Sequence, residues 1–233
     1  MIGWIRYEET GAPRIERKRY GGTAVLIMRV PRGTGLRALF AAHRSASFFA
    51  RQRVRLAAFP VDYSHTGIFL RRGIASPDVT QLNLACAPQI AVLALRQSGA
   101  AADNANVALV SEKTCGELHS AAHSLARAVR YLTLWTPDGE ALARALQQEY
   151  GIAAKVLREG DALRANLALS FDAAKKQCIA LADECLKASY SALLDGQRCT
   201  DAPLLAALLA VGALRAQDIR LERLILPAAA NFS

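Results

Sequence analysis

Apolar and polar positions follow two different spacings along the first hundred residues. Runs rich in β-branched and aromatic residues, each with Gly or Pro close to an end, predict strands at Ile2–Glu8 and Thr23–Val30. Residues 14–19, between them, are charged apart from one isoleucine, which fits either a solvated strand or a loop. Apolar residues at helical spacing then predict a helix from Gly35 to about Arg53, with Thr34 as its N-cap.

The predicted helix has an apolar face and a basic one. A short strand is expected at 54–59, and a further helix at 78–97 should be kinked or divided by Pro88, which lacks an N–H. The small, polar segment 98–105 is the best candidate for a linker. The residues expected to point inward from the first helix are Leu36, Phe40, His43, Ser47 and Ala50, with Leu39, Ala46 and Phe49 beside them.

Beyond the linker, strands and helices alternate. The T-x-x-E pattern of Thr114 and Glu117 predicts a capping box, and Gly151 stands where a helix would end in a left-handed cap. This alternation favours parallel strands with right-handed crossovers, so the fold class is α/β, with domains at 1–99 and 100–233. Strands are expected at 107–110, 129–135, 152–157, 165–171, 178–182, 189–194 and 219–226, and helices after Thr114, after Thr136 and at 203–214.

The order of elements from Asn106 to Asp172 resembles Rossmann-type, dinucleotide-binding domains. That resemblance implies a parallel sheet flanked by helices. An N-terminal α/β portion is expected to pack beside it or to contribute to a larger shared sheet. The first strand–helix turn reads Ser-Glu-Lys-Thr-Cys-Gly over 111–116, and only Gly116 matches the G-x-G-x-x-G fingerprint. Thr136 stands where the ribose-binding acid is usual. No cofactor is therefore predicted, and a standard NAD site is not expected.

Composition narrows the class of protein. The chain has 233 residues, enough for a substantial core, and its longest apolar run, 203–214, is too short to span a bilayer. No secretory signal is recognised at the start. Five cysteines without a C-x-x-C pair argue against a disulfide framework or a structural zinc site. We expect a cytoplasmic protein that does not act at a membrane.

Positive charge is concentrated in the first third. Residues 1–77 hold 14 Lys and Arg against 4 Asp and Glu, whereas the remainder holds 15 against 16. Such asymmetry can indicate an anionic partner, a basic surface balanced by another subunit of a homo-oligomer, or a solvated face. Aromatic residues lie among these arginines, as in proteins that bind single-stranded nucleic acid, although no nucleic-acid-binding motif is present.

The 111–116 turn is the first candidate site. The free N–H groups at a helix N-terminus attract anions, so Ser111, Lys113, Thr114 and Gly116 could hold a small phosphate or carboxylate. The alternative is that Thr114 only caps the helix. Cys115, at the same helix start, could have a lowered pKa or be an ordinary small residue.

Two further candidates involve histidines. His119 and His123 are spaced i, i+4, as two metal ligands would be, but no third ligand is evident, so edge packing is the alternative and no metal is predicted. Asp62 and His65 lie in an irregular segment, where catalytic groups often occur. An enzyme would use them in a cleft between the two domains, together with the 111–116 turn.

These observations favour a cytoplasmic binding or regulatory module that is not catalytic, with a small anion as its ligand. The first alternative is an enzyme whose catalytic residues include Asp62 and His65. The second is a nucleic-acid-binding protein that uses the basic first third.

Overall fold

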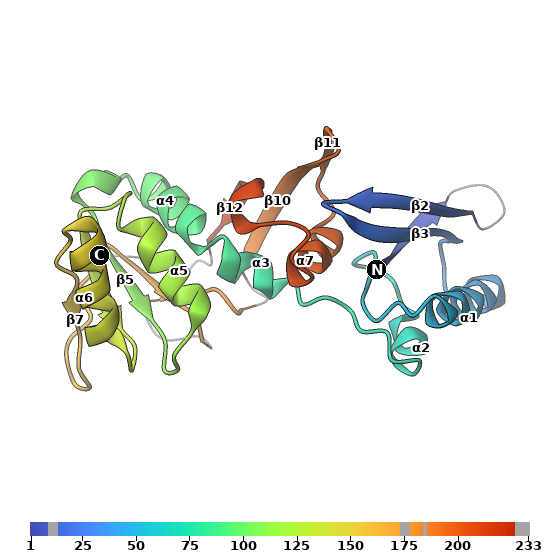
Figure 1. Cartoon of the computed structure of the whole chain (residues 1–233), viewed down its shortest axis with the longest axis horizontal. Coiled ribbons are helices and arrows are strands. Elements are labelled where there is room, and N and C mark those ends of the chain that lie inside the picture. The colour runs from blue at the N-terminus through green and yellow to red at the C-terminus, as the bar shows by residue number, and fades with distance from the viewer. Residues whose placement is uncertain (9–13, 173–177, 184–185, 227–233) are drawn as a thin grey trace. The chain divides into compact units, whose positions relative to one another are not determined.

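The computed structural model of the chain describes residues 1–8, 14–172, 178–183 and 186–226 (Figure 1). They form two compact units. The N-terminal unit comprises Met1–Val79 and Ser191–Ile219, and the Rossmann-like unit comprises the described parts of Thr80–Tyr190 and Arg220–Ser233. This division differs from the expected domains 1–99 and 100–233. The helices between residues 80 and 97 belong with the parallel sheet, because their buried side chains join its core.

A five-stranded sheet forms the Rossmann-like unit. Each neighbouring pair of strands is parallel, which confirms the expected pairing of the segments at Val107 and Tyr131. With the strands numbered along the chain, the order is 3-2-1-4-5, which matches five of the six strands in the doubly wound order 3-2-1-4-5-6. The strands are β5 (Asn106–Val110), β6 (Tyr131–Trp135), β7 (Lys155–Val156), β8 (Leu167–Ser170) and β9 (Ile179–Ala180), in the order β7-β6-β5-β8-β9.

Three helices pack side by side on this sheet (Figure 1). They are α4 (Ala87–Gln97), α5 (Gly116–Leu125) and α6 (Gly139–Tyr150). Alternate residues of the strands turn toward them, and these leucines and valines form one core with the helices because strand side chains alternate between the two faces. Pro88 lies in the first turn of α4 and separates it from α3 (Thr80–Ala85), as expected.

The C-terminal strand is joined to α4 by side chains. Gln97 donates to the carbonyl of Leu224 at 3.1 Å, and the N–H of Leu221 donates to Gln89 at 2.9 Å. A three-stranded sheet contains β10 (Lys187–Leu194), β11 (Gln197–Cys199) and β12 (Ile219–Ile225) in the order β11-β10-β12. Two short helices, η1 (Ala102–Asn104) and η2 (Ala216–Asp218), precede β5 and β12.

The N-terminal unit is built on a mixed sheet. Strand β1 is parallel to both β3 and β4, whereas β2 and β3 form an antiparallel hairpin. Gly21 and Gly22 connect the hairpin and both have positive φ, as a two-residue type I′ turn requires. The strands are β1 (Ile2–Glu8), β2 (Ile15–Tyr20), β3 (Thr23–Pro31) and β4 (Ala57–Ala58), in the order β2-β3-β1-β4.

One face of this sheet is covered by α1 (Leu36–Arg51), which packs with α2 (Thr66–Leu70). The predicted inward face of α1 is wrong. Leu36 and Phe40 are 74% and 71% exposed, and His43 and Ala50 are exposed as well. Small residues allow the helix axis to approach the sheet closely, so the alanine-rich side is buried and the larger side chains point outward. The buried residues are Ala38, Ala42, Ser45, Ala46 and Phe49.

The apolar run near the C-terminus forms helix α7 (Ala202–Ala210), a buried helix as expected, which contacts β1 and β4. Asp201 caps it by accepting a hydrogen bond from the N–H of Leu204 at 2.9 Å. Among the described residues, none of the helices combines the length and the apolar character that crossing a bilayer requires.

Candidate functional site at the carboxyl edge of the sheet

A cavity of about 580 Å³ lies where three neighbouring strands of the Rossmann-like unit end. Open α/β sheets bind their ligands at this edge, because the loops that follow parallel strands converge there. The cavity is lined by Ser111 and Glu112 after β5, by Trp135, Thr136 and Pro137 at the end of β6, and by Leu157 and Glu159 after β7.

The loop after β5 is held by a carboxylate from within the chain. Asp172, which follows β8, accepts a short hydrogen bond of 2.5 Å from the N–H of Glu112. The Ser111 hydroxyl donates to the carbonyl of Lys113 at 2.7 Å and lies 3.4 Å from the other Asp172 oxygen. The Asp172 carboxylate thus already accepts a hydrogen bond from the Glu112 N–H, a group that would otherwise be available to a bound phosphate.

The helix that follows begins without the predicted capping box. Its N-cap is Cys115 rather than Thr114, and the N-cap side chain forms no capping hydrogen bond. Gly116 has no positive φ, and a Cβ added there would have no atom within 4 Å. Gly116 therefore does not provide the close helix–strand packing that the third glycine of the dinucleotide fingerprint allows.

Of the four residues predicted to bind an anion, only Ser111 lines the cavity; Lys113, Thr114 and Gly116 are exposed on the turn beside it. Sequence reasoning missed Leu157, Glu159 and Asp172. Their position just after predicted strands was the signal that could have found them, because the carboxyl ends of parallel strands meet at one edge.

The charge of the cavity is negative. Glu112 and Glu159 contribute carboxylates, and no Lys, Arg or His is among the described residues that line it. Trp135, Pro137 and Leu157 supply apolar surface, including one large aromatic ring. Such a lining suits a ligand that has a flat apolar part and hydrogen-bond donors, and it disfavours an anion.

Cys115 does not have the lowered pKa that its place at a helix start could produce. Burial is the largest effect and raises the pKa of this thiol, and a hydrogen bond to Glu117 acts in the same direction. The N–H groups of Leu118 and Glu117 oppose the shift without overcoming it.

Alkylation of Cys115 by iodoacetamide at pH 7.5 is therefore expected to be slower than that of a free cysteine, because only the thiolate reacts. Peptide mass spectrometry over a time course measures the rate. Cys86 is the internal control: it is buried, burial raises its pKa to about 12, and it should react only on unfolding. Faster labelling of Cys115 than of free cysteine would mean an activated thiol.

The two histidines of α5 connect this helix to α6. His119 lies 2.5 Å from the carboxylate of Asp138, and His123 lies 3.1 Å from Glu149 and 3.3 Å from the hydroxyl of Tyr150. Within the described part of the chain, no three His, Cys, Asp or Glu side chains gather as a metal site would need. Both rings lie at a packing edge between two helices, the alternative to metal binding that the sequence left open.

Asp138 is the N-cap residue of α6, and its carboxylate forms hydrogen bonds with both His119 and Thr136. Burial acts to raise its pKa, but hydrogen bonds from Thr136 and His119 outweigh burial and the pKa is lowered. A lowered pKa in the folded state stabilises the protein above the unfolded pKa of about 3.9, and this stabilisation is lost as the pH falls through the folded value.

Asp138→Asn is accordingly expected to reduce the free energy of unfolding at pH 7 by about 1–2 kcal/mol, the contribution of hydrogen bonds to a charged group. The difference between wild type and variant should begin to narrow below about pH 4, where the unfolded carboxylate takes up a proton, and should vanish as the pH falls through the lower pKa of the folded state. Urea unfolding at pH 3.5 and pH 7 measures both values. An equal difference at the two pH values would contradict this role.

The segment with Asp62 and His65 lies in the N-terminal unit, whereas the 111–116 turn lies in the Rossmann-like unit. Asp62 pairs with Arg32 at 2.7 Å, and the hydrogen bond from Arg32 is the largest cause of its lowered pKa. His65 packs edge-on against Tyr63, and its Nε2 atom is buried without a partner. No hydrogen bond joins these two described side chains, Asp62 and His65, and their catalytic role stays a prediction.

Comparisons with known proteins add little. No family model matches the chain, and the search of curated proteins found no match. Among solved structures, L-tryptophan dehydrogenase from Nostoc punctiforme is similar over 64% of this chain and 44% of its own, with 13% identity and a TM-score of 0.31. This chain thus spans less than half of that protein's length, and a likeness at this TM-score carries no argument about function.

Proposed function

We propose that the protein is a cytoplasmic small-molecule-binding module whose ligand occupies the carboxyl edge of the Rossmann-like sheet. The ligand is uncharged or cationic and combines a flat ring with hydroxyl or amino donors, as a nucleoside does. The observation that carries this proposal is the cavity of about 580 Å³ between the ends of β5, β6 and β7. Its volume lies in the usual range for small-molecule sites, about 300–1,000 Å³.

The lining supports this ligand class over the small anion that the sequence suggested. The ring of Trp135 with Pro137 and Leu157 offers an apolar wall, and the carboxylates of Glu112 and Glu159 accept hydrogen bonds from donors. The Asp172 carboxylate already accepts from the turn where an anion would bind. A phosphate would meet three negative charges there and no cation among the described lining residues.

The polar groups of this edge also support binding rather than catalysis. The Ser111 hydroxyl donates to a backbone carbonyl, and the Thr136 hydroxyl donates to Asp138 at 2.8 Å. These hydroxyls hold the two loops in shape, and the thiol of Cys115, in the loop after β5, has a raised pKa. A regulatory or carrier function needs a shaped cavity but not an activated group.

Titration with adenosine and AMP, followed by the fluorescence of Trp135 in a Trp4→Phe background, tests the proposal at this cavity. We expect saturable binding of adenosine and weaker binding of AMP, because the phosphate repels the carboxylates of Glu112 and Glu159. Glu159→Gln should reduce the preference for adenosine over AMP several-fold, whereas Glu140→Gln, an exposed glutamate of α6 outside the cavity, should not. Tighter binding of AMP than of adenosine, lost in Lys113→Gln, would instead establish the anion site at the 111–116 turn.

Helix α1 favours nucleic acid as a second candidate ligand. Its outer face carries Arg37, Arg44 and Arg51 at seven-residue spacing beside the exposed ring of Phe40, and the helix contains no acidic residue. Binding of a fluorescent single-stranded oligonucleotide should weaken with salt and should weaken at least about tenfold when all three arginines are replaced by glutamine. No binding even at low salt would exclude this candidate.

A further inference from the structure

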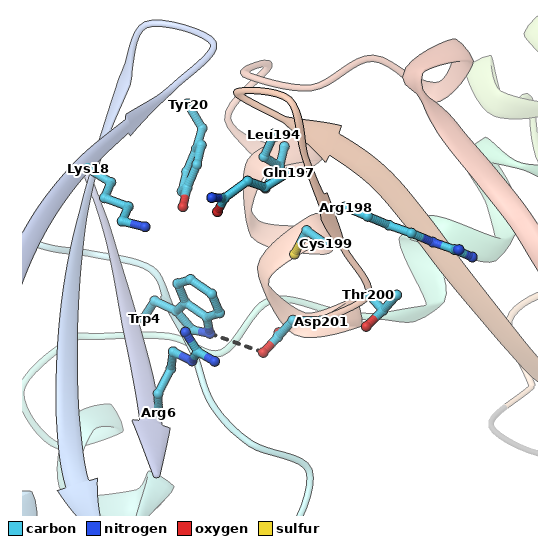
Figure 2. Close-up of a pocket in the computed structure, with 10 residues that line it drawn as sticks. All are labelled: Trp4, Arg6, Lys18, Tyr20, Leu194, Gln197, Arg198, Cys199, Thr200 and Asp201. Atoms are coloured by element: carbon cyan, nitrogen blue, oxygen red, sulfur yellow. Dashed lines mark hydrogen bonds between the residues drawn. The ribbon is translucent and has the colours of Figure 1, made fainter. Parts of the chain in front are cut away.

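A second cavity lies wholly within the N-terminal unit, apart from the site proposed above (Figure 2). Its volume is about 470 Å³. Strands β1 and β2 form one wall, and the segment through β11 to the start of α7 forms the other. The lining residues are Trp4, Arg6, Lys18, Tyr20, Leu194, Gln197, Arg198, Cys199, Thr200 and Asp201.

The cavity is on the sheet face that α1 does not cover. Trp4 and Arg6 are two residues apart on β1, as are Lys18 and Tyr20 on β2, so each pair shares a face of its strand. Residues of the opposite parity, such as Ile5, belong to the core with α1. Lys18, Tyr20 and Arg6 therefore project toward the same space, in which the Cys199 thiol also lies (Figure 2).

The carboxylate of Asp201, which lines the cavity, already accepts two hydrogen bonds from within the chain. One oxygen of Asp201 accepts from the N–H of Leu204 at 2.9 Å, and the other accepts from Nε1 of Trp4 at 3.1 Å. Among the described residues, neither Arg6 nor Lys18 forms an ion pair. The cavity thus has two cations with no carboxylate partner in the described chain.

Arg6 is held in position by the indole beside it. Its guanidinium carbon lies 4.8 Å from the centre of the Trp4 ring, which is itself fixed by the bond to Asp201. A stacked guanidinium loses less conformational freedom when it binds, and its N–H groups match the oxygens of a phosphate or carboxylate. Arg198, by contrast, points away from the centre of the cavity (Figure 2).

The other polar groups are neutral donors. Burial is the main cause of the raised pKa of Tyr20 and of Cys199, so both keep their protons at neutral pH. The amide of Gln197 and the hydroxyl of Thr200 lie on the opposite wall. Two cations and several neutral donors form a site for a group with several acceptor oxygens and a double negative charge.

We infer that this cavity binds a phosphorylated small molecule, with the phosphate between Arg6 and Lys18 and the remainder of the ligand against Tyr20 and Gln197. A phosphate monoester has three terminal oxygens and a double negative charge, which match two cations and several neutral donors better than a single carboxylate does. The cavity of about 470 Å³ exceeds the volume of a free phosphate ion, so an organic part is accommodated as well.

Titration calorimetry of the full chain with phenyl phosphate at low ionic strength tests this site, with inorganic phosphate and benzoate as the other arms. We expect phenyl phosphate to bind more tightly than either. Lys18→Gln and Arg6→Gln should each weaken binding about tenfold, the effect of losing one charge-assisted hydrogen bond. Lys113→Gln, the same change on the 111–116 turn, should leave binding unchanged.

Lys18 is exposed on β2, so Lys18→Gln should fold normally even if Arg6→Gln, which loses the stacked indole contact, does not. Fluorescence of Trp4 in a Trp135→Phe background gives a second measurement of binding at this cavity. Absence of saturable binding, equal binding by wild type and Lys18→Gln, or weakening only by Lys113→Gln would each overturn the inference. Because adenosine lacks a phosphate, a negative result with phenyl phosphate would overturn this inference without bearing on adenosine binding in the Rossmann-like unit.

Discussion

Phe49→Ala is expected to destabilise the N-terminal unit by about 3–5 kcal/mol, the usual cost of removing a buried phenylalanine. The Phe49 side chain is 0% exposed, and its ring lies 6.1 Å from that of Phe69 in a cluster of aromatic residues. It also packs on Gly3, where an added Cβ would come within 2.4 Å of the ring. The cavity left by alanine could not close, because the sheet backbone forms one of its walls.

Phe40→Ala is the matched control, since it makes the same change on the same helix at a side chain that is 71% exposed. It should change stability by less than about 0.5 kcal/mol, as surface substitutions usually do. Urea unfolding followed by Trp4 fluorescence in a Trp135→Phe background reports on this unit alone, since Trp4 and Trp135 are the two tryptophans of the chain. A larger effect of Phe40→Ala would reinstate the helix face that the sequence predicted.

Gly3→Ala provides a further check on this contact. On its own it should destabilise the unit by about 1–3 kcal/mol through overpacking. Combined with Phe49→Ala it should cost little more than Phe49→Ala alone, because the ring that blocks the new methyl group is gone. Additive effects of the two substitutions would contradict direct contact between the residues.

Asn83→Ala has the second largest expected effect, about 2–4 kcal/mol in the Rossmann-like unit. Asn83 lies on α3, donates to the carbonyl of Leu181 at 3.0 Å and accepts from the hydroxyl of Tyr190 at 2.5 Å. Tyr190 is 2% exposed, and burial is the largest cause of its raised pKa. Alanine would leave a buried carbonyl and a buried hydroxyl unpaired, and each such group costs about 1–3 kcal/mol.

Two control variants test whether the loss of stability comes from the two buried hydrogen bonds of Asn83 or from replacing any asparagine by alanine. Tyr190→Phe removes one donor and leaves the bond to Leu181, so it should cost less than Asn83→Ala. Asn104→Ala removes an exposed asparagine of the same unit and should change stability by less than about 0.5 kcal/mol. Urea unfolding followed by Trp135 fluorescence measures all three. Equal effects of Asn83→Ala and Asn104→Ala would show that the buried bonds contribute nothing.

The α/β class and the parallel sheet were predictable because each element carries its own local signal. Strands β5 and β6 are short apolar runs, α4 begins with Pro88 in its first turn, and Gly151 ends α6 with a φ of 70°. Alternation of strands and helices then restricts the topology to parallel pairing. The observed order β7-β6-β5-β8-β9, in which β6 and β8 both pair parallel with β5, is consistent with parallel pairing.

The candidate sites were less predictable, because a cavity depends on which side chains meet. Ser111 was found because it lies in the first strand–helix turn, where the dinucleotide fingerprint is expected, whereas Glu159 and Asp172 follow later strands and match no motif. The basic character of the first third was visible in the sequence, whereas the meeting of Arg6 and Lys18 with Gln197 and Cys199 was not. Gln197 and Cys199 are each more than 170 positions from Arg6 and from Lys18 along the chain.

The sequence by itself determined the kinds of elements, their order and the absence of the dinucleotide fingerprint, since these depend on neighbouring residues. Only the tertiary structure decided which face of α1 is buried, where the two compact units divide, and that Asp172 occupies the turn after β5. Those outcomes depend on packing between distant segments: the fit of Phe49 over Gly3, for example, brings the side of α1 with small residues against the sheet.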